Sequence, residues 1–508
     1  MSRINTNIPS VIAQANLSRN NKELSIRLER LSTGLRINRG ADDPAGLIIS
    51  ERMRSDIAGV DQGIKNSDRA SSMISTTEAA LAEVNDLLNS IRGLIVESAN
   101  TGAVSEEERN ANQLQIDSAI ESITRISNTA TFGGLRLLDG SLDYSLSGVR
   151  TSAIAVAQVR SASLINNASL KVDVDVLTSA QRGKLFFRSS AATPGVFLST
   201  MNLEIKGPKG VQELRFLSNT ALSNVVAGVN NLKNFTGVEA VLLPGNSGMV
   251  FRSLEYGGDE FVSVRRTNAP TAGNTFQLFR YPQATAEPAA ATWASMESAT
   301  DDRGRDVTAI VNGYLATGRG LSMSVNSPAL SLDLKLTESL ATLPSAAVSS
   351  FYITGGGALF QLGPEVTALQ QTNFGIPSVA ASRLGAAKTD NGIEFLSSLK
   401  TGARNSIAEA VRRNDFTAAQ DVLGAAIDEV TELRGRLGAF EKNVLDTNVR
   451  SLQSQFENLT ASESRIRDAD FAFETSRLTR AQILASAGTS TLSLANQQSQ
   501  SVLQLLNG

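Results

Sequence analysis

Residues 17–35 read LSRNNKELSIRLERLSTGL and carry leucines at 17, 24, 28, 31 and 35. From residue 24 onward the leucines alternate steps of four and three, the spacing of an apolar stripe on a helix that packs on other helices. The last segment repeats this spacing with Ala485, Gly488, Leu492, Ala495, Ser499, Val502 and Leu506. Both ends of the chain are therefore predicted to be helices that bury one narrow stripe.

The partner of these terminal stripes is not evident in the sequence. Such stripes usually close an intramolecular helix bundle, but no segment of the chain flanks these two. We therefore expect them to pack on neighbouring molecules, and a contact that repeats without closing builds a helical filament. The predicted assembly residues are the larger apolar side chains at both ends: Leu17, Leu24, Leu28, Leu31, Leu35, Leu478, Ile483, Leu484, Leu492, Leu494, Val502, Leu505 and Leu506.

The 508 residues include no histidine and no cysteine. These absences remove the usual general base at neutral pH, the usual metal ligands, and every Ser-His-Asp, Cys-His or zinc-bound-water mechanism. An enzyme would have to use other groups, for example the two carboxylates of a glycosidase, but nothing in the sequence positions such a pair. We expect no enzyme, no cofactor and no metal site.

Three motifs that resemble binding sites have a plainer interpretation. Asp42-Asp43 precedes Pro44, which favours a helix N-cap over a metal or catalytic pair. Gly355-Gly356-Gly357 is not followed by Lys-Ser/Thr, which disfavours a phosphate-binding loop. Asp468 and Asp470 lie among arginines and are interpreted as a solvated or inter-subunit ion-pair cluster.

The charge pattern gives no indication of nucleic-acid binding or membrane insertion. The net charge is −3, and the locally basic residues 1–40 carry a narrow leucine stripe without aromatic residues, which disfavours a membrane-surface helix. The start of the chain lacks the apolar stretch of a signal peptide, and no run reaches about 18 apolar residues. Export would therefore need a route that reads no cleavable signal.

Two long helical segments are predicted inside the terminal helices. Pro44 begins a helix of about 55 residues, roughly 80 Å long. Helical spacing returns near Ser397 and shifts by one residue between Val444 and Leu445. The predicted stripe residues of the two segments are Ile57, Val60, Ile64, Ile74, Leu81 and Leu88 in the first, and Val430, Leu433, Leu437, Phe440, Val444, Leu452 and Phe456 in the second.

Between these segments lie a further helix and a β-rich region. Ser105 and Glu108 form a capping box for a helix whose stripe begins at Leu114 and Ile116, and which ends before Gly133-Gly134. From about Leu170, apolar and polar residues alternate, as in a half-buried strand. Further strand-like runs separated by turn residues follow, interrupted by a short helix at 222–232.

The sequence therefore predicts an α+β multidomain, hairpin-like chain with helical coiled-coil or bundle domains at both ends and a mostly β central insert. Residues 1–42 and 465–508 are assigned to a terminal helical domain, and residues 43–174 and 391–464 to a helical rod domain. Residues 175–390 form the insert, with one or two subdomains.

The motifs at both ends resemble those of bacterial flagellin. The N-terminal motifs are Ile4-Asn5-Thr6-Asn7, the stretch LSTGLRIN at 31–38 and the turn DDPAG at 42–46. The C-terminal motifs are RIRDADFA at 465–472, LTRAQIL at 478–484 and Ala495-Asn496-Gln497. The resemblance covers roughly residues 1–145 and 399–508.

This resemblance implies a structural subunit of the flagellar filament, with the terminal helices at the filament core and the insert outside. It also implies partners: other copies, filament cap and hook-associated proteins, a cytoplasmic chaperone at the C-terminal helix, and type III export to the cell exterior. A lone helix with a thin stripe does not offset its ordering entropy, which suits export before folding. The alternative is a hook–filament junction protein, which shares the terminal motifs.

One segment departs from the family pattern. In many flagellins the stretch corresponding to residues 89–98 carries an arginine followed three residues later by a glutamate, within the surface that a vertebrate innate-immune receptor recognises. Here those positions are Ser90 and Gly93, although Arg92 and Leu94 remain. We predict weak or no recognition by that receptor.

Overall fold

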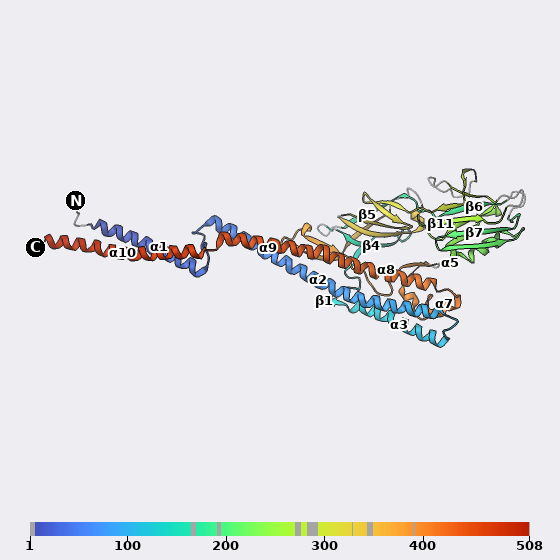
Figure 1. The fold of residues 1–508 in the computed structure, drawn as a ribbon, viewed down its shortest axis with the longest axis horizontal. Coiled ribbons are helices and arrows are strands. Elements are labelled where there is room, and N and C mark those ends of the chain that lie inside the picture. The colour runs from blue at the N-terminus through green and yellow to red at the C-terminus, as the bar shows by residue number, and fades with distance from the viewer. Residues whose placement is uncertain are drawn as a thin grey trace. The chain divides into compact units, whose positions relative to one another are not determined.

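The computed structural model confirms an α+β chain with helical ends and a central region of antiparallel sheets (Figure 1). It describes residues 6–162, 164, 169–189, 195–269, 276–281, 293–327, 329–342, 349–389 and 392–506. The chain divides into two compact units. The terminal unit comprises Met1–Thr76, Phe360–Gln371 and Gly435–Gly508, and the central unit comprises Thr77–Leu359 and Thr372–Arg434.

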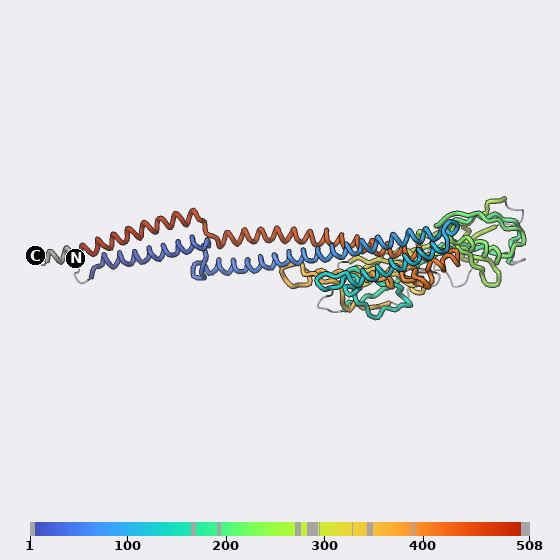
Figure 2. The backbone as a smooth tube through the Cα atoms, turned by 90° about the horizontal axis from the view of Figure 1, so that it is seen from below, coloured from blue at the N-terminus to red at the C-terminus, as the bar shows by residue number. Residues whose placement is uncertain are grey.

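In the terminal unit, α1 (Ile8–Thr33) and α10 (Phe471–Leu506) lie side by side and run antiparallel (Figures 1 and 2). The side chain of Asn7 accepts a hydrogen bond from the Ser10 amide and caps α1. The helix ends at Gly34, whose φ of 73° is a left-handed conformation that glycine adopts without strain. Gly34 therefore ends α1.

The long helix α2 (Pro44–Ala99) begins where the sequence predicts. Asp43 Oδ1 accepts the amide of Gly46 at 2.9 Å, which satisfies a free N–H of the first turn. The helix continues for 56 residues. Of its predicted stripe residues, Val60, Ile74, Leu81 and Leu88 are buried, and Ile57 and Ile64 are partly buried.

The second long segment consists of α8 (Thr417–Phe440), the π-helical turn η6 (Glu441–Leu445) and α9 (Asp446–Arg467). Its predicted stripe residues Val430, Leu433, Leu437, Phe440 and Leu452 are buried, and Phe456 is partly buried. Val444 is 36 % exposed whereas Leu445 is 1 % exposed, so the placement of Val444 in the stripe is wrong. A π-helical turn holds an extra residue, which moves the stripe from Val444 to Leu445.

In the central unit, α3 (Glu106–Thr129) begins with the predicted capping box. Ser105 Oγ accepts the amide of Glu108, and Glu108 Oε2 accepts the amide of Ser105. Ile116 is buried, but Leu114 is 68 % exposed, so its placement in the stripe is wrong. Two residues turn an α-helix by about 200°, which puts Leu114 opposite Ile116. The short helix α7 (Ile407–Arg413) lies beside α3.

An eight-stranded antiparallel sheet with the order β3-β19-β5-β15-β16-β17-β18-β4 forms one part of the insert. The predicted alternation is confirmed in β5, where Val172, Val174 and Val176 are buried in a core that contains Phe351. The strands are β3 (Tyr144–Ser147), β4 (Ile154–Ala162), β5 (Leu170–Thr178), β15 (Thr308–Val311), β16 (Tyr314–Arg319), β17 (Ser322–Asn326), β18 (Leu330–Leu336) and β19 (Ser349–Gly356), with α6 (Glu338–Ala341) packed on the same core.

Strand structure begins earlier than the sequence suggests. β3 and β4 lie before residue 170, in a stretch that we assigned to the helical rod. Most residues of β4 are partly buried, and alanines occupy several of its positions. Because small residues lie on both faces, apolar and polar residues do not alternate along β4 as they do in a half-buried strand. The sequence therefore did not predict this strand.

Two smaller sheets share a second core, which contains Phe197, Phe251 and Leu203. One sheet contains β6 (Lys184–Arg188), β9 (Val238–Leu242), β10 (Gly248–Ser253), β12 (Leu278–Arg280) and β13 (Glu297–Ser298). The other contains β7 (Met201–Gly207), β8 (Gly210–Phe216), β11 (Phe261–Arg266) and β14 (Asp301–Arg303). The helix α4 (Leu222–Asn230) packs on this core and confirms the short helix predicted there, and α5 (Lys233–Thr236) lies beside β8.

The remaining elements are short hairpins and 3-10 turns. They are β1 (Thr131–Phe132) with β2 (Leu135–Arg136), β20 (Ala358–Gln361) with β21 (Gln371–Phe374), β22 (Ala387–Thr389) with β23 (Gly392–Glu394), and η2 (Pro244–Asn246), η3 (Trp293–Ser295), η4 (Ala368–Gln370) and η5 (Leu396–Leu399). The hairpin of β20 and β21 provides a surface considered below.

Candidate assembly surfaces

A buried ion cluster joins α1 to α10. Arg27 Nη1 donates to both carboxylate oxygens of Glu474, at 3.1 and 3.0 Å, and Arg30 Nη1 donates to Glu474 Oε1 at 3.2 Å. Arg27 and Glu474 are both buried, and Arg27 also reaches Glu23 at 3.2 Å. Breaking a buried pair leaves an uncompensated charge, so this cluster fixes the register of the two helices.

Arg27, and not the neighbouring Leu28, belongs to the α1 stripe. The face of α1 toward α10 is formed by Ala13, Leu17, Asn20, Leu24, Arg27 and Leu31, in alternating steps of four and three. Leu28 is 49 % exposed, so its placement in the stripe is wrong. The sequence reading missed Arg27 because it treated only apolar residues as stripe members.

The α10 stripe continues further toward the start of the helix than predicted. Its members are Glu474, Leu478, Ala481, Ala485, Gly488, Leu492 and Ala495, all buried or partly buried. Gly488 lies against Leu17, since a Cβ on this glycine would be 3.2 Å from Leu17 Cδ1. Near the end of the pair, Asn7 Nδ2 donates to the Ala495 carbonyl at 3.0 Å. The structure describes the helix backbone at Ser499, Val502, Leu505 and Leu506 but not their side chains.

The expectation that the terminal stripes lack a partner within the chain is wrong. The stripes of α1 and α10 pack on one another, because the chain reverses direction between its first and last helices. Small residues on α10, such as Ala481, Gly488 and Ala495, allow the two helices to approach closely. The sequence showed both stripes but not that they face each other.

The segments that lead into the terminal helices are also joined to each other. The Arg36 amide donates to the Arg467 carbonyl at 2.7 Å, and the Ala469 amide donates to the Gly34 carbonyl at 2.9 Å. Asp470 Oδ1 caps α10 by accepting the Phe473 amide at 3.0 Å, and Asp468 accepts the Ser464 hydroxyl at 2.6 Å. The two aspartates therefore have local hydrogen-bonding roles within the chain.

Large apolar side chains are exposed on α1 and α10 away from the shared stripe. We call these residues the outer faces: Ile8, Val11, Ile12 and Leu28 on α1, and Phe471, Phe473, Ile483, Leu484 and Leu494 on α10. Three of the predicted assembly residues of α10, Ile483, Leu484 and Leu494, belong to this group. Leu35 is partly buried just beyond α1. Clustered exposed apolar side chains mark interaction surfaces.

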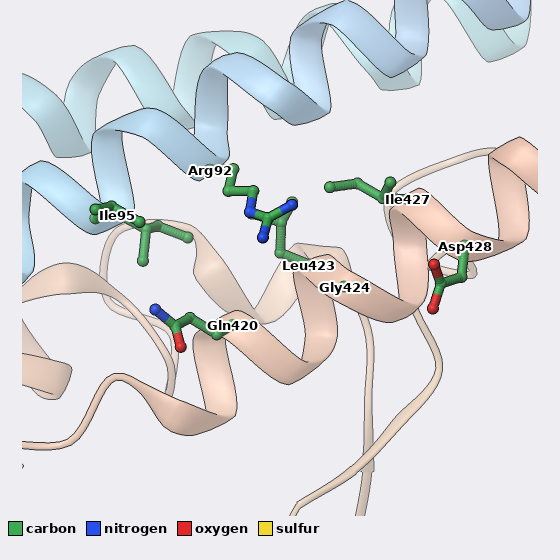
Figure 3. Close-up of a pocket in the computed structure, with 8 residues that line it drawn as sticks. Arg92, Ile95, Gln420, Leu423, Gly424, Ile427 and Asp428 are labelled. Atoms are coloured by element: carbon green, nitrogen blue, oxygen red, sulfur yellow. The ribbon is translucent and has the colours of Figure 1, made fainter.

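The central unit contains a groove between α2 and α8, with a cavity of about 340 Å³ (Figure 3). It is lined by Arg92, Ile95 and Val96 of α2 and by Gln420, Leu423, Gly424, Ile427 and Asp428 of α8. Ser90 and Gly93 are exposed on the same helix, and a Cβ on Gly93 would meet no atom within 4 Å. The groove combines an apolar lining with charged groups.

Within the described parts of the chain, no group of three or more acidic side chains is placed to hold a metal ion. In the same residues, no helix is both long and apolar enough to cross a membrane. Paired terminal helices with apolar outer faces, together with a β-rich insert, fit a structural protein that packs on other molecules.

The comparisons with known proteins identify the family. The bacterial flagellin N-terminal helical region matches residues 4–143, and the bacterial flagellin C-terminal helical region matches residues 420–506. Flagellin of Salmonella choleraesuis and B-type flagellin of Pseudomonas aeruginosa are each 29 % identical to this chain, with 99 % of both chains aligned. The chain belongs to the bacterial flagellin family, whose members are structural proteins, and it is a subunit of the flagellar filament.

Solved structures were also matched, at low similarity. The D1-D2-D3 domains of the flagellar cap protein FliD from Escherichia coli align with 64 % of this chain and 96 % of that chain, at 15 % identity and a TM-score of 0.28. FliC from Burkholderia pseudomallei aligns with 74 % and 99 %, at 13 % identity and a TM-score of 0.23. These TM-scores are too low to carry an argument about this chain.

Proposed function

We propose that the outer faces of α1 and α10 are the surfaces by which copies of this chain pack into the filament that drives swimming. The observation that supports this is the division of apolar residues on the terminal helices. Small residues and an ion cluster fill the shared stripe, while larger side chains such as Phe471, Ile483 and Leu494 are exposed. Their burial by a second copy contributes about 25 cal/mol per Å² of apolar area.

The predicted assembly residues then divide into two roles. Leu28, Ile483, Leu484 and Leu494 are exposed and would contact neighbouring copies, whereas Leu17, Leu24, Leu31, Leu478 and Leu492 are partly buried and would hold the helix pair together. A surface that binds a different surface of the next copy repeats without closing, which builds a filament.

We extend the proposal to the route and partners of the chain. The subunit would leave the cytoplasm unfolded through the type III apparatus, with a chaperone covering the apolar residues of α10 until export. Outside the cell it would polymerise beneath the filament cap and join hook-associated proteins at the filament base. It would perform no chemistry and bind no cofactor.

The proposal is tested by seeded polymerisation, followed by electron microscopy, with the full chain beside a chain that lacks residues 1–40 and 470–508. We expect long, uniform filaments from the full chain only. Equal assembly by the truncated chain would exclude the terminal helices as the assembly surfaces. If the full chain only terminates existing filaments, the hook–filament junction function replaces filament growth.

Recognition by the innate-immune receptor is tested separately with purified monomer. We expect a weak reporter response, and a gain of response when Ser90→Arg and Gly93→Glu are combined, because both positions are exposed on α2. A full-strength response to the unaltered chain would contradict the prediction.

A further inference from the structure

The hairpin of β20 and β21 ends in a loop, residues 362–370, that we call the hairpin tip. Its Val366 and Leu369 side chains are 84 % and 98 % exposed. A single exposed apolar side chain is ordinary in soluble proteins. Two of them on one loop suggest a contact surface when the loop itself is held in place.

Hydrogen bonds within the hairpin order this loop. Gln361 Nε2 donates to the carbonyls of Gly363 and Glu365, at 2.9 and 2.7 Å. From the other side, Gln370 Oε1 accepts the Glu365 amide at 2.6 Å, and the Gln370 carbonyl accepts the Leu362 amide at 2.9 Å. The backbone of the tip is therefore set before any partner binds.

The hairpin tip is also anchored to the helices of the terminal unit. The tip packs closely against two glycines of α2, where a side chain would leave no room. A Cβ on Gly59 would lie 2.9 Å from Pro364 Cβ, and a Cβ on Gly63 would lie 3.0 Å from the Leu362 carbonyl oxygen. Asn448 Nδ2 of α9 donates to that same carbonyl at 2.9 Å. A rigid surface loses little conformational entropy on binding, which favours a docking role.

The groove between α2 and α8 offers a complementary surface. Ile95, Val96, Leu423 and Ile427 supply apolar side chains, and Figure 3 shows Arg92 extending from α2 toward α8. A Cβ on Gly424 would meet no atom within 4 Å, so this part of the groove is open. The groove can receive aliphatic side chains beside a guanidinium group.

The charges on the two surfaces also match. Glu365 is the only charged residue in the hairpin 358–374. Within the part of the chain that the structure describes, neither its carboxylate nor the Arg92 guanidinium has an ion-pair partner. Asp428, the other charge of the groove, lies apart from Arg92 in Figure 3.

We propose that the hairpin tip of one copy docks into this groove of a second copy, with Val366 and Leu369 on the apolar lining and Glu365 beside Arg92. The inference rests on the filament function of the chain, because a filament supplies a second copy at every repeat. The tip and the groove are different surfaces, so each copy offers one and receives the other, and the contact continues along the filament.

Filling the groove tests the proposal in the full-length chain. Gly424→Leu adds a side chain into open space, and Gly435→Leu on the same helix is the matched control, since a Cβ there also meets no atom within 4 Å. We expect Gly424→Leu to raise the critical concentration for polymerisation about tenfold, the effect of losing roughly one aliphatic anchor. The control should assemble like the unaltered chain. Normal assembly by Gly424→Leu would overturn the proposal.

Crosslinking tests the geometry directly, because the chain contains no cysteine. Leu369→Cys and Gly424→Cys are placed in separate chains, which are then assembled together and oxidised. Disulfide-linked dimers should form in the mixed filaments and not in filaments of either variant alone. Mixed filaments without dimers would overturn the proposal. If the unaltered chain fails to polymerise, the filament function itself fails, so the two failures are distinguishable.

Charge reversal provides a third test. Glu365→Arg and Arg92→Glu should each raise the critical concentration about two- to fivefold, as expected for one exposed ion pair. The double variant should recover most of the loss, because the pair is restored with opposite signs. Additive losses in the double variant would show that the two residues do not meet.

Discussion

The terminal helix pair and the eight-stranded sheet bury very different residues. The sheet encloses Phe351 and the valines of β5 in a hydrophobic core. The pair of α1 and α10 encloses Ala13, Ala481, Ala495 and an ion cluster, and it leaves most of its larger apolar side chains outside. A fold that buries so little apolar area offsets less of its ordering entropy, so we expect the pair to depend on neighbouring copies more than the sheet does.

The largest expected effect follows from removing the carboxylate of the ion cluster. Glu474→Ala leaves Arg27 and Arg30 without their shared counter-charge, at a cost of about 3–5 kcal/mol. We expect polymerisation to fail over the accessible concentration range while the insert melts as before. The control is Arg39→Ala, which removes an exposed pair with Glu29 worth at most about 1 kcal/mol. Filaments from Glu474→Ala at the normal critical concentration would show that the cluster is dispensable.

The converse prediction concerns the sheet core. Phe351→Ala should destabilise the insert by about 3–5 kcal/mol, because it opens a cavity where Phe351 is fully buried. Calorimetry should show a lower melting temperature for the insert, while the chain still polymerises at the normal critical concentration. Loss of polymerisation in this variant would mean that the insert and the terminal pair are not energetically separate.

A smaller effect should appear as a pH dependence of the insert. Burial raises the pKa of Asp302 from 3.8 to about 6, although its carboxylate accepts the Lys184 amide at 2.8 Å. The folded state therefore binds the carboxyl proton of Asp302 more tightly than the unfolded state does. The contribution of Asp302 to stability is full below about pH 4 and is lost, by on the order of 3 kcal/mol, as the pH rises through about 6.

Asp302→Asn isolates that contribution, because an amide oxygen can still accept the Lys184 amide but does not titrate. The free energy of unfolding, measured with urea at a series of pH values, should fall less between pH 4 and 6 in this variant than in the unaltered chain. An unchanged pH profile would assign the dependence to other groups.

The smallest expected effect comes from the π-helical turn. Deleting Val444, which is exposed, should convert η6 into an α-helical turn while Leu445 keeps its buried face. We expect a change in stability of less than about 1 kcal/mol, within the range of surface changes. Circular dichroism melts would detect a larger loss, which would indicate that the turn itself has a structural role.

Features set by short-range interactions were predictable from the sequence. The start of α2 at Pro44, the capping box at Ser105 and the end of α1 at Gly34 each depend on a few adjacent residues. The alternation of apolar and polar residues in β5 is likewise visible within a single strand. The apolar stripes are visible over a few turns of a helix. The strand β4 was missed because its small residues carry no such contrast.

The candidate surfaces were predictable only in part. The sequence identified large apolar residues at both ends, including the exposed Ile483 and Leu494, but it counted Leu28 in a stripe that Arg27 occupies. Nothing in the local pattern marks an arginine as buried, because its place depends on a carboxylate from another helix. The hairpin tip and the groove were not predicted at all, since both arise from contacts between distant segments.

The sequence by itself determined the helical ends, the β-rich middle, the absence of histidine and cysteine chemistry, and the motifs of the family. Caps, periodicity and composition are properties of neighbouring residues, so they can be read along the chain. Only the tertiary structure decided that α1 faces α10, that Arg27 meets Glu474 across 447 positions, and which apolar residues remain outside. Those outcomes depend on the direction in which the chain returns, and no local pattern encodes that direction.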